Sequence, residues 1–257
     1  MTKNMPKTAM IVWNTMVHDA RVTKEAQTLA RHGHSVRVFC FASDGRTPAD
    51  ETIEPGFSIC RVNRTPMRFL RKLFSRAEPA EAHSSSGAAD RQASAGAPGG
   101  PLVWSYRFLN FASVHFKLLV RIVKYRPDTV HAHDVNTLPT AWLAARLSGA
   151  RLIYDAHEIS TDREGYKKLR SAVFITEKLL MPAAVAVITT TDMRAKYLAR
   201  AYKRKRPAVL QNRPRRSPQK SKDNTWLRQH FGIDERLPIV LYQGGLQQGR
   251  GLVSVVR

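Results

Sequence analysis

The feature that most constrains the fold is an alternation of two hydrophobic periods along the chain. Short apolar runs, such as 8–13 (TAMIVW) and 35–42 (SVRVFCFA), have the length and composition of buried strands. Between such runs, apolar residues recur at the spacing of one helix face, as Val22, Ala26 and Leu29 do. Strands that alternate with helices in this way predict an α/β fold, with a parallel sheet and helices on both of its faces.

Helices separate most of the predicted strands, so the expected sheet is Rossmann-like. The seven strands are 8–13, 35–42, 57–62, 128–133, 151–155, 184–189 and 208–211. The helices are 22–30, 102–123, 138–149, 168–180 and 191–202. In 102–123, apolar residues at 102, 106, 109, 116, 120 and 123 indicate the face that packs on the core. Ligands of such sheets bind beyond the carboxyl ends of the strands, so candidate site residues are sought there.

The length of 257 residues predicts between one and two domains, at ~150 residues each. We expect a Rossmann-like domain over 1–215, interrupted at 77–100 by an Ala-, Gly-, Ser- and Pro-rich insertion that its composition predicts to be disordered. Residues 216–236 are the expected interdomain segment. A new strand at 238–242 opens a second α/β domain, and 237–257 holds only the start of that domain.

The charge and cysteine content narrow the class of protein. Lys and Arg exceed Asp and Glu by 22 (42 minus 20), which favours anionic partners without choosing among nucleic acid, anionic lipid and phosphorylated substrates. Cys40 and Cys60 lie in apolar strands and are expected to be reduced core residues, which indicates a reducing compartment. The sequence has no signal-peptide pattern and no apolar stretch near the ~18 residues of a membrane span, so the expected location is the cytoplasm.

The loop after the first strand, 14–21, contains no glycine. A G-x-G-x-x-G loop there would let the backbone approach a pyrophosphate, so its absence argues against an NAD or FAD enzyme. The loop instead places His18, Asp19 and Arg21 at a helix N-terminus, where a phosphate or a sugar hydroxyl could bind. The alternative is that Asp19 caps the helix and Arg21 is solvated.

The fourth strand ends in a polar loop that follows two histidines. Strand alternation puts His131 and His133 on one side of the sheet, with His133 nearer the strand end. A metal site would need both histidines with Asp134 and His157, and we disfavour it because no further ligand cluster is evident. We expect His131 to be a core residue with satisfied hydrogen bonds, and His133, Asp134 and Asn136 to be site residues.

The fifth strand ends in a similar way, with His157 and Glu158 after Asp155. The imidazole of His157 could donate or accept a proton near neutral pH. Two strand ends that each present a histidine beside an acid favour a functional site at this edge. The alternative is that each histidine only bonds a neighbouring carboxylate.

Six segments, taken in order, carry a family resemblance. They are DARVTKEAQTLARHGHSVRV (19–38), RPDTVHAHD (126–134), GARLIYDAHE (149–158), AVITTTDMRAKYL (186–198), VLQNRP (209–214) and PIVLYQGGLQQGRGL (238–252). The chain resembles the N-terminal half of GT-B glycosyltransferases of family 4, which are retaining enzymes that use nucleotide sugars. The resemblance implies two Rossmann-like domains facing each other across a cleft. The N-terminal domain would hold mainly the acceptor, and the C-terminal domain mainly the nucleotide sugar.

The resemblance also implies roles by position. His157 matches the family histidine that lines the reaction centre beside the transferred sugar, and it is the expected catalytic residue. Asn212 lies where the family chain crosses between the domains. The residues expected to bind acceptor or substrate are His18, Asp19, Arg21, His133, Asp134, Asn136 and Glu158.

The loop 244–251 resembles the family's diphosphate-binding loop, with Gly244, Gly245 and Arg250 as the expected donor-binding residues. Many members have Arg where this chain has Gly245, so phosphate binding would depend on Arg250. The family's paired glutamates, E-x7-E, belong to the C-terminal domain and do not occur in this sequence, so the chain alone is expected to be inactive. The resemblance implies no metal and no cofactor besides the nucleotide-sugar co-substrate, and the sequence has no D-x-D motif.

Segment 64–76 has amphipathic spacing, with basic residues at 64, 68, 71 and 72. That pattern is typical of a helix on an anionic membrane surface and fits a peripheral enzyme with a glycan or lipid-linked acceptor in cell-envelope polysaccharide synthesis. The alternative is a domain-packing helix with a solvated basic face. The basic run 203–206 lacks interleaved aromatic residues, so no nucleic-acid partner is expected. The alternative function for the whole chain is a non-catalytic or split-half domain that binds a sugar or a lipid head group.

Overall fold

The structure is a computed structural model that describes residues 5–43, 46–64, 101–214 and 225–243, together with 252 and 254. Of residues 101–104 and 164 it describes only the backbone. The described residues up to Asn212 belong to one compact unit, and those from Arg213 onward belong to a second. Helix α7 (Trp226–Phe231) lies in the second unit, and every other helix and strand named below lies in the first.

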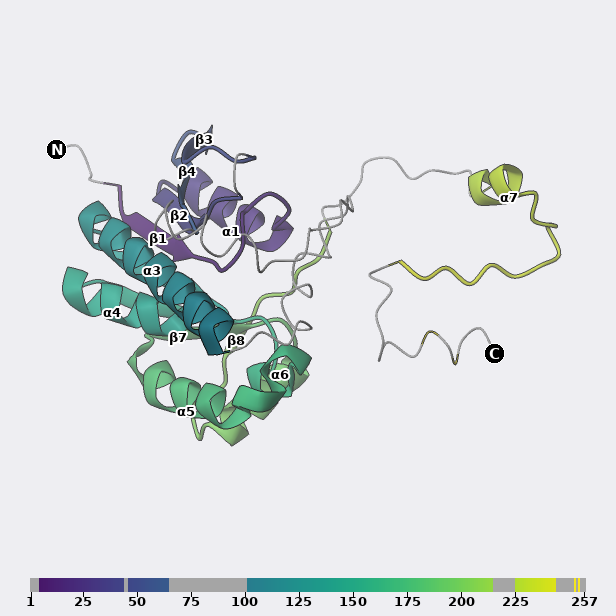
Figure 1. Ribbon diagram of the computed structural model, residues 1–257. Helices are drawn as coiled ribbons and strands as arrows, with labels where there is room; N and C mark the ends of the chain where they lie inside the picture. Colours follow the sequence, from purple (N-terminus) through teal and green to yellow (C-terminus); the bar gives the residue numbers. More distant parts are fainter. Residues whose placement is uncertain are drawn as a thin grey trace. The chain divides into compact units, whose positions relative to one another are not determined.

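The first unit is built on one sheet (Figure 1). Its strands, among the described residues, lie in the order β3-β4-β2-β1-β5-β6-β7-β8. All neighbouring pairs are parallel except β3 and β4. This confirms the Rossmann-like parallel sheet. The bounds are β1 Lys7–Ile11, β2 Ser35–Phe41, β3 Asp50–Glu54, β4 Phe57–Val62, β5 Thr129–His133, β6 Arg151–Ala156, β7 Ala186–Thr189 and β8 Ala208–Val209.

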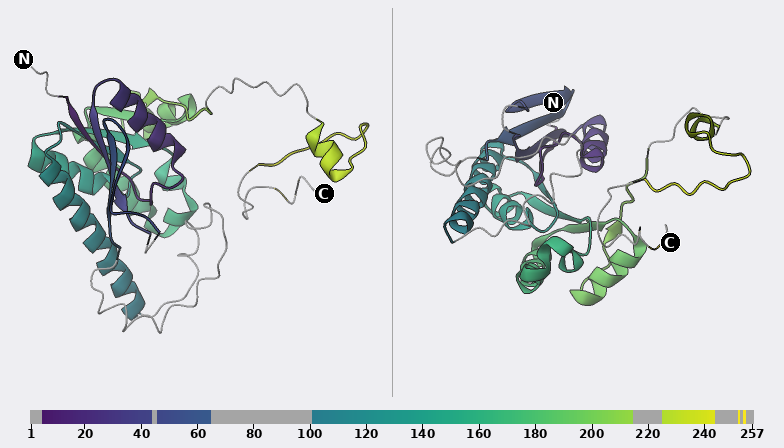
Figure 2. Two further views of the ribbon diagram at one scale, coloured as in Figure 1. Left: turned by 90° about the horizontal axis from the view of Figure 1, so that it is seen from above. Right: turned by 45° about the vertical axis from the view of Figure 1, so that its right-hand side comes forward.

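Helices cover both faces of the sheet, as the two further views show (Figure 2). On one face, α3 and α4 pack on residues of β1, β2, β5 and β6 in the larger core. On the other face, Val22 and Ala26 of α1 pack on β1, β2 and β4 in a second core. The bounds are α1 Ala20–Arg31, α3 Pro101–Tyr125, α4 Leu138–Ser148, α5 Arg170–Leu180 and α6 Asp192–Ala201, with short 3-10 turns at Ser160–Asp162, Glu164–Leu169 and Met181–Ala183.

The alternation of side chains along the strands decides which face carries the polar residues. In β5, Val130 and Ala132 belong to the larger core, so the histidines at 131 and 133 face the side of α1. In β6, Tyr154 belongs to the larger core, so Asp155 also faces α1. His133 and Asp155 are register partners in the β5–β6 pair. The fold therefore brings these polar side chains together under one helix.

The structure differs from the sequence-based prediction in three places. Strand β3 was not expected, because its sequence DETIE is charged and largely exposed and lacks an apolar run. Residues 238–242 form no strand, and Val240 is 81% exposed. A strand needs a partner for its backbone groups, and among the described residues of the second unit no strand provides one. Cys40 and Cys60 are free and buried, as expected.

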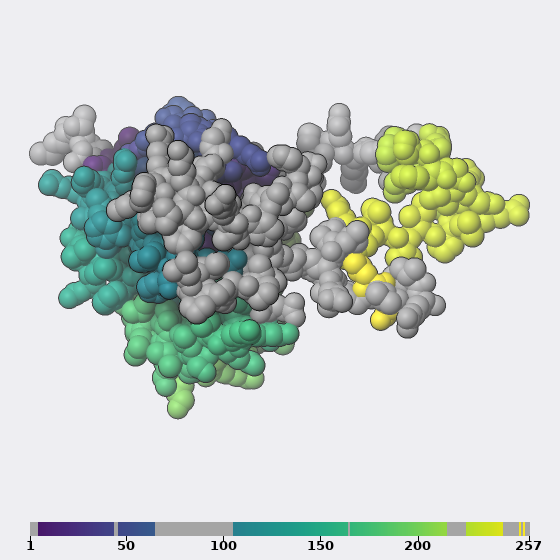
Figure 3. All heavy atoms as spheres, in the orientation of Figure 1, coloured from purple at the N-terminus to yellow at the C-terminus, as the bar shows by residue number. Residues whose placement is uncertain are grey.

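The third correction concerns α3, whose buried side differs from the predicted one. Val114, Leu118 and Ile122 are buried, whereas Leu109 and Phe116 are 56% and 66% exposed. The helix is apolar on several sides, so periodicity alone could not select the core face. Figure 3 shows α3, in teal, on the surface of the first unit. Among the described helices, none is both long and apolar enough to cross a membrane.

Candidate active site

The candidate site lies at the carboxyl ends of β5 and β6. The strand order reverses direction between β1 and β5, which is the position where open α/β sheets bind their ligands. Asp134 follows β5 with a positive φ of 66°. Asp is among the residues that adopt this left-handed conformation most readily, and here it turns the chain toward α4.

His157 follows β6 and lies between two carboxylates. Its Nε2 is 3.3 Å from Asp155 Oδ2, and its Nδ1 is 3.7 Å from Asp134 Oδ1. Burial alone would lower the pKa of His157, but the hydrogen bond to Asp155 and the charge of Asp134 outweigh burial and raise that pKa. The side chain remains 20% exposed. His157 is therefore an oriented imidazole at the rim of the site.

The backbone of His157 is also fixed. Arg194 on α6 donates from Nη1 to the His157 carbonyl oxygen at 2.8 Å. The Thr190 hydroxyl donates to the same oxygen at 3.2 Å. Arg194 lies in the segment 186–198 that carries part of the resemblance, but its contact joins two different segments, so the sequence could not show it. These contacts tie the loop after β6 to the start of α6.

Arg21 and Asp155 form a buried ion pair beneath His157. Arg21 Nε and Nη2 donate to Asp155 Oδ2 at 3.0 and 2.6 Å, and Arg21 Nη1 donates to the Leu210 carbonyl oxygen at 2.9 Å. Burial would raise the pKa of Asp155, but the hydrogen bond to His157 and the charge of Arg21 hold it well below its usual value. The alternative that Arg21 is solvated is wrong, because the side chain is buried. It lies 134 residues from Asp155 in the sequence, so spacing could not reveal the pair.

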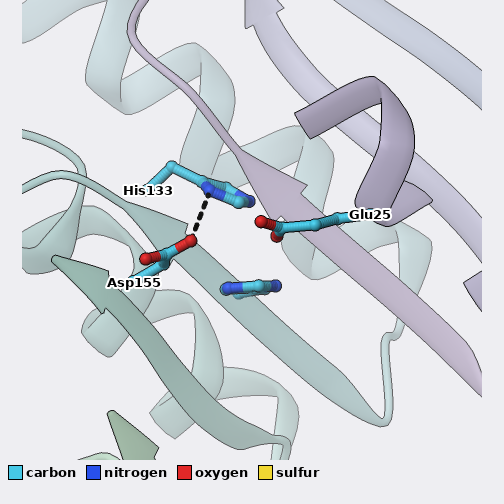
Figure 4. A group of neighbouring side chains, drawn as sticks. Glu25, His133 and Asp155 are labelled. Atoms are coloured by element: carbon cyan, nitrogen blue, oxygen red, sulfur yellow. Dashed lines mark ion pairs between the residues drawn. The ribbon is translucent and has the colours of Figure 1, made fainter. Parts of the chain in front are cut away.

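Glu25 and His133 lie beside Asp155 on the α1 side (Figure 4), and His131 lies next to His133. His131 and His133 are stacked, with ring centroids 4.2 Å apart. Burial lowers the pKa of His131 to about 4, and burial and the neighbouring His131 lower the pKa of His133 well below its usual value. Glu25 Oε1 lies 3.1 Å from Arg21 Nε, yet burial and the Asp155 charge raise the Glu25 pKa to about 7. His131 is a core residue as expected, but its Nε2 has no hydrogen-bond partner.

The remaining predicted residues divide between capping and exposed positions. Asp19 caps α1, because its Oδ1 accepts from the Val22 amide at 3.1 Å, which confirms the capping alternative for this residue. His18 and Glu158 are exposed, and Asn136 is half-buried. Gly244, Gly245 and Arg250 lie outside the described residues, as does segment 64–76 apart from its first residue.

Arg163 is a site residue that the sequence analysis missed. Its Nη1 lies 3.8 Å from Asp134 Oδ2, and its Nε lies 3.8 Å from Glu158 Oε2. It therefore links the loop after β5 to the loop after β6. Farther along the same edge, Lys24 Nζ donates to Asn212 Oδ1 at 2.6 Å.

The sheet order and the polar edge at β5 and β6 agree with the Rossmann-like half of a GT-B glycosyltransferase fold, which the following solved structures match. Sucrose-phosphate synthase from Thermosynechococcus elongatus matches with a TM-score of 0.55 and 14% identity, over 80% of this chain and 48% of that one. A glycosyltransferase from Rickettsia africae matches with a TM-score of 0.52 and 15% identity, over 99% of this chain and 56% of that one. At these identities the likeness concerns the fold.

The family follows from a separate comparison. The family model described as a glycosyl transferase 4-like domain matches residues 19–213, and the chain belongs to that family. No curated protein matches the sequence significantly. The chain spans about half the length of the two solved structures named above, 48% and 56%.

Proposed function

We propose that this chain is the acceptor-side part of a retaining glycosyltransferase that uses a nucleotide-sugar donor. The observation that carries the proposal is His157 at the carboxyl edge of β6, in a chain of the glycosyl transferase 4-like family. The ring is partly exposed and is oriented by Asp155 and Asp134. A side chain held in this way can contact the transferred sugar without first losing much conformational freedom.

In the proposed reaction, the bond between the anomeric carbon and the diphosphate breaks, and the acceptor hydroxyl attacks the same face. The acceptor oxygen then bonds to the anomeric carbon, and its proton leaves with the departing diphosphate. The protein contributes positioning and stabilises the charge that develops on the leaving group. Residues 244–251, with Gly244, Gly245 and Arg250, are proposed to hold that diphosphate together with the rest of a donor domain.

The acceptor is proposed to be a glycan or a lipid-linked sugar. Asp134, Asn136 and Glu158 lie along the proposed acceptor loops, and Arg163 joins two of them. The net charge of +22 favours an acceptor attached to, or near, an anionic surface. Segment 64–76 is the proposed contact with the inner face of a membrane, in an enzyme of cell-envelope polysaccharide synthesis.

The experiment uses the complete gene product that contains this chain. A panel of nucleotide sugars is screened for release of the nucleotide with transfer to lipid and glycan acceptors, and the anomeric configuration of the product is read by NMR. We expect His157→Ala to lower kcat by at least about 100-fold with the fold intact. His32→Ala, at an exposed histidine that ends α1, is the matched control and should keep full activity.

Two results would contradict the proposal. An inverted product would refute retention, and near-normal transfer by the His157 variant would refute its role. The non-catalytic alternative predicts no transfer with any donor, together with a monodisperse 257-residue chain that binds a sugar or a lipid head group.

A further inference from the structure

The inference starts from buried polar atoms that have no hydrogen-bond partner. Five of those found among the described residues lie in one place: both carboxylate oxygens of Glu25, Nε2 of His131, Nε2 of His133 and Oδ1 of Asp155. His131, His133 and Asp155 are 4%, 2% and 0% exposed. One ligand atom from each of the four residues lies within 4.8 Å of the others. Figure 4 shows Glu25, His133 and Asp155 converging on a common point.

Such a group of atoms needs a partner. Leaving a buried donor or acceptor unpaired costs the full desolvation of that group, and native proteins contain few such atoms. Here five of them lie in a single cluster. A bound species that accepts lone pairs from all four residues would remove this cost at once.

The donor set selects a cation. Imidazole nitrogen and carboxylate oxygen together are the ligands of Zn²⁺ and of neighbouring divalent transition metals. A metal binds the neutral imidazole, and both rings are buried, at 4% and 2% exposed, where a charged ring is disfavoured. The two carboxylates face a single guanidinium, that of Arg21, which lies 3.1 Å from Glu25 and 2.6 Å from Asp155.

The contacts behind these ligands suit a metal site. His133 Nδ1 lies 3.7 Å from Asp155 Oδ2, a carboxylate oxygen that favours the proton on Nδ1, and in that tautomer the lone pair on Nε2 is available to a ligand. Arg21 bonds Asp155 through Oδ2 and leaves Oδ1 available. A tetrahedral zinc site with bonds of ~2.1 Å places its ligand atoms about 3.4 Å apart, so small side-chain rotations would close the cluster.

We propose that Glu25, His131, His133 and Asp155 bind one divalent transition-metal ion, of the Zn²⁺ class. Four protein ligands in a buried cluster leave no open position, so the ion is structural and fastens α1 to β5 and β6. The ligand set differs from the one considered from sequence, because Glu25 and Asp155 take the places of Asp134 and His157. The proposal stands apart from the proposed catalysis, which uses His157 and no metal.

The test measures metal in the complete protein, produced without a histidine tag. The protein is stripped with EDTA, titrated with Zn²⁺ and, separately, with Co²⁺, and dialysed. We expect one equivalent of zinc by mass spectrometry of the metal, a tetrahedral Co²⁺ absorption spectrum, and a zinc-dependent rise in Tm. Glu25→Gln, which preserves the size of the side chain, should weaken zinc binding at least tenfold.

Matched controls separate this site from surface binding. His115→Gln changes a half-buried histidine outside the cluster and should leave zinc binding unchanged. Cys40→Ala tests whether a thiol contributes and should also have no effect. Zinc content below a tenth of an equivalent in the wild-type protein would overturn the proposal. Stoichiometric zinc that survives unchanged in both Glu25→Gln and His133→Asn would overturn it as well.

Discussion

Two buried glutamates, Glu177 on α5 and Glu25 on α1, lie on opposite faces of strand β6 and have different hydrogen-bond partners. Glu177 on α5 is fully buried, and its Oε1 accepts hydrogen bonds from the hydroxyls of Tyr154 and Ser160 at 2.6 and 2.9 Å. Its Oε2 accepts from the Tyr202 hydroxyl. Glu25 on α1 lies on the face of Asp155, and neither of its oxygens has a hydrogen-bond partner.

The comparison shows that the hydrogen-bond partners of a buried carboxylate indicate whether the folded chain alone can stabilise it. The Glu177 network is closed, because each carboxylate oxygen has donors from the chain itself, and it needs nothing more than folding. The burial of these hydroxyls beside a carboxylate raises the pKa of Tyr154 and Tyr202, so both stay protonated as donors. The Glu25 cluster is open, and an open buried cluster points to a bound species.

The largest effect on the free energy of unfolding is expected when the Glu177 network is removed. Glu177→Ala leaves three buried or half-buried hydroxyls without their acceptor, and each loss costs about 1–3 kcal/mol, so we expect a destabilisation of about 4 kcal/mol. Urea denaturation of the variant measures it, with Glu235→Ala at an exposed position as the control. A loss below about 1 kcal/mol would show that the hydroxyls find other partners and that the network is not closed.

A smaller effect on stability is expected at His115, where only one of the two ring nitrogens has a hydrogen-bond partner. Its Nδ1 pairs with the Thr140 hydroxyl at 2.7 Å, its ring stacks on Trp13, and its Nε2 has no partner. Burial lowers the pKa of His115 from 6.5 to about 4. The unfolded chain therefore binds the proton more readily, and stability should fall as the pH drops from about 6.5 to 4, by up to about 3 kcal/mol.

The measurement for His115 is the difference in unfolding free energy between wild type and His115→Gln as a function of pH. Other groups titrate equally in both proteins and cancel in that difference. We expect the wild type to lose more stability than the variant between pH 6.5 and 4. Parallel curves would mean that His115 titrates normally in the folded protein.

The smallest effect on the free energy of unfolding is expected for the Glu25 cluster when no metal is bound. In EDTA, Glu25→Gln should change the free energy of unfolding by less than about 1 kcal/mol, because it alters only the 3.1 Å contact between Glu25 and Arg21, and Arg21 keeps its hydrogen bonds to Asp155. The same urea series measures it. A loss as large as that of Glu177→Ala would mean that Glu25 is held by the chain alone, and the contrast between the two glutamates would disappear.

Much of the fold could be predicted from the sequence, because the strands and helices alternate with clear periods. The seven predicted strands all exist, although the ends of several differ by one or two residues. β3 could not be predicted, because an edge strand with exposed charges has no apolar signal. The core face of α3 could not be predicted either, because the helix has apolar residues on more than one side.

The site could be predicted only in part. Strand ends and alternation placed His133, Asp134 and His157 along one edge, and the structure brings them together. The partners of Asp155 could not be found, because Arg21 and Glu25 reach it from a helix about 130 residues earlier, and only the packing of α1 on the sheet creates that contact. Motif spacing reports neighbours in sequence, whereas this cluster depends on the tertiary fold.

The central claim is that a bound cation completes the Glu25 cluster, whereas the chain alone completes the Glu177 network. The most direct measurement is a crystal structure of the zinc-loaded protein, with anomalous difference maps on both sides of the zinc absorption edge. The account predicts one peak about 2.1 Å from ligand atoms of His131, His133, Asp155 and Glu25, and none near Glu177. Ordered water in place of that peak, or zinc only at surface histidines, would contradict the account.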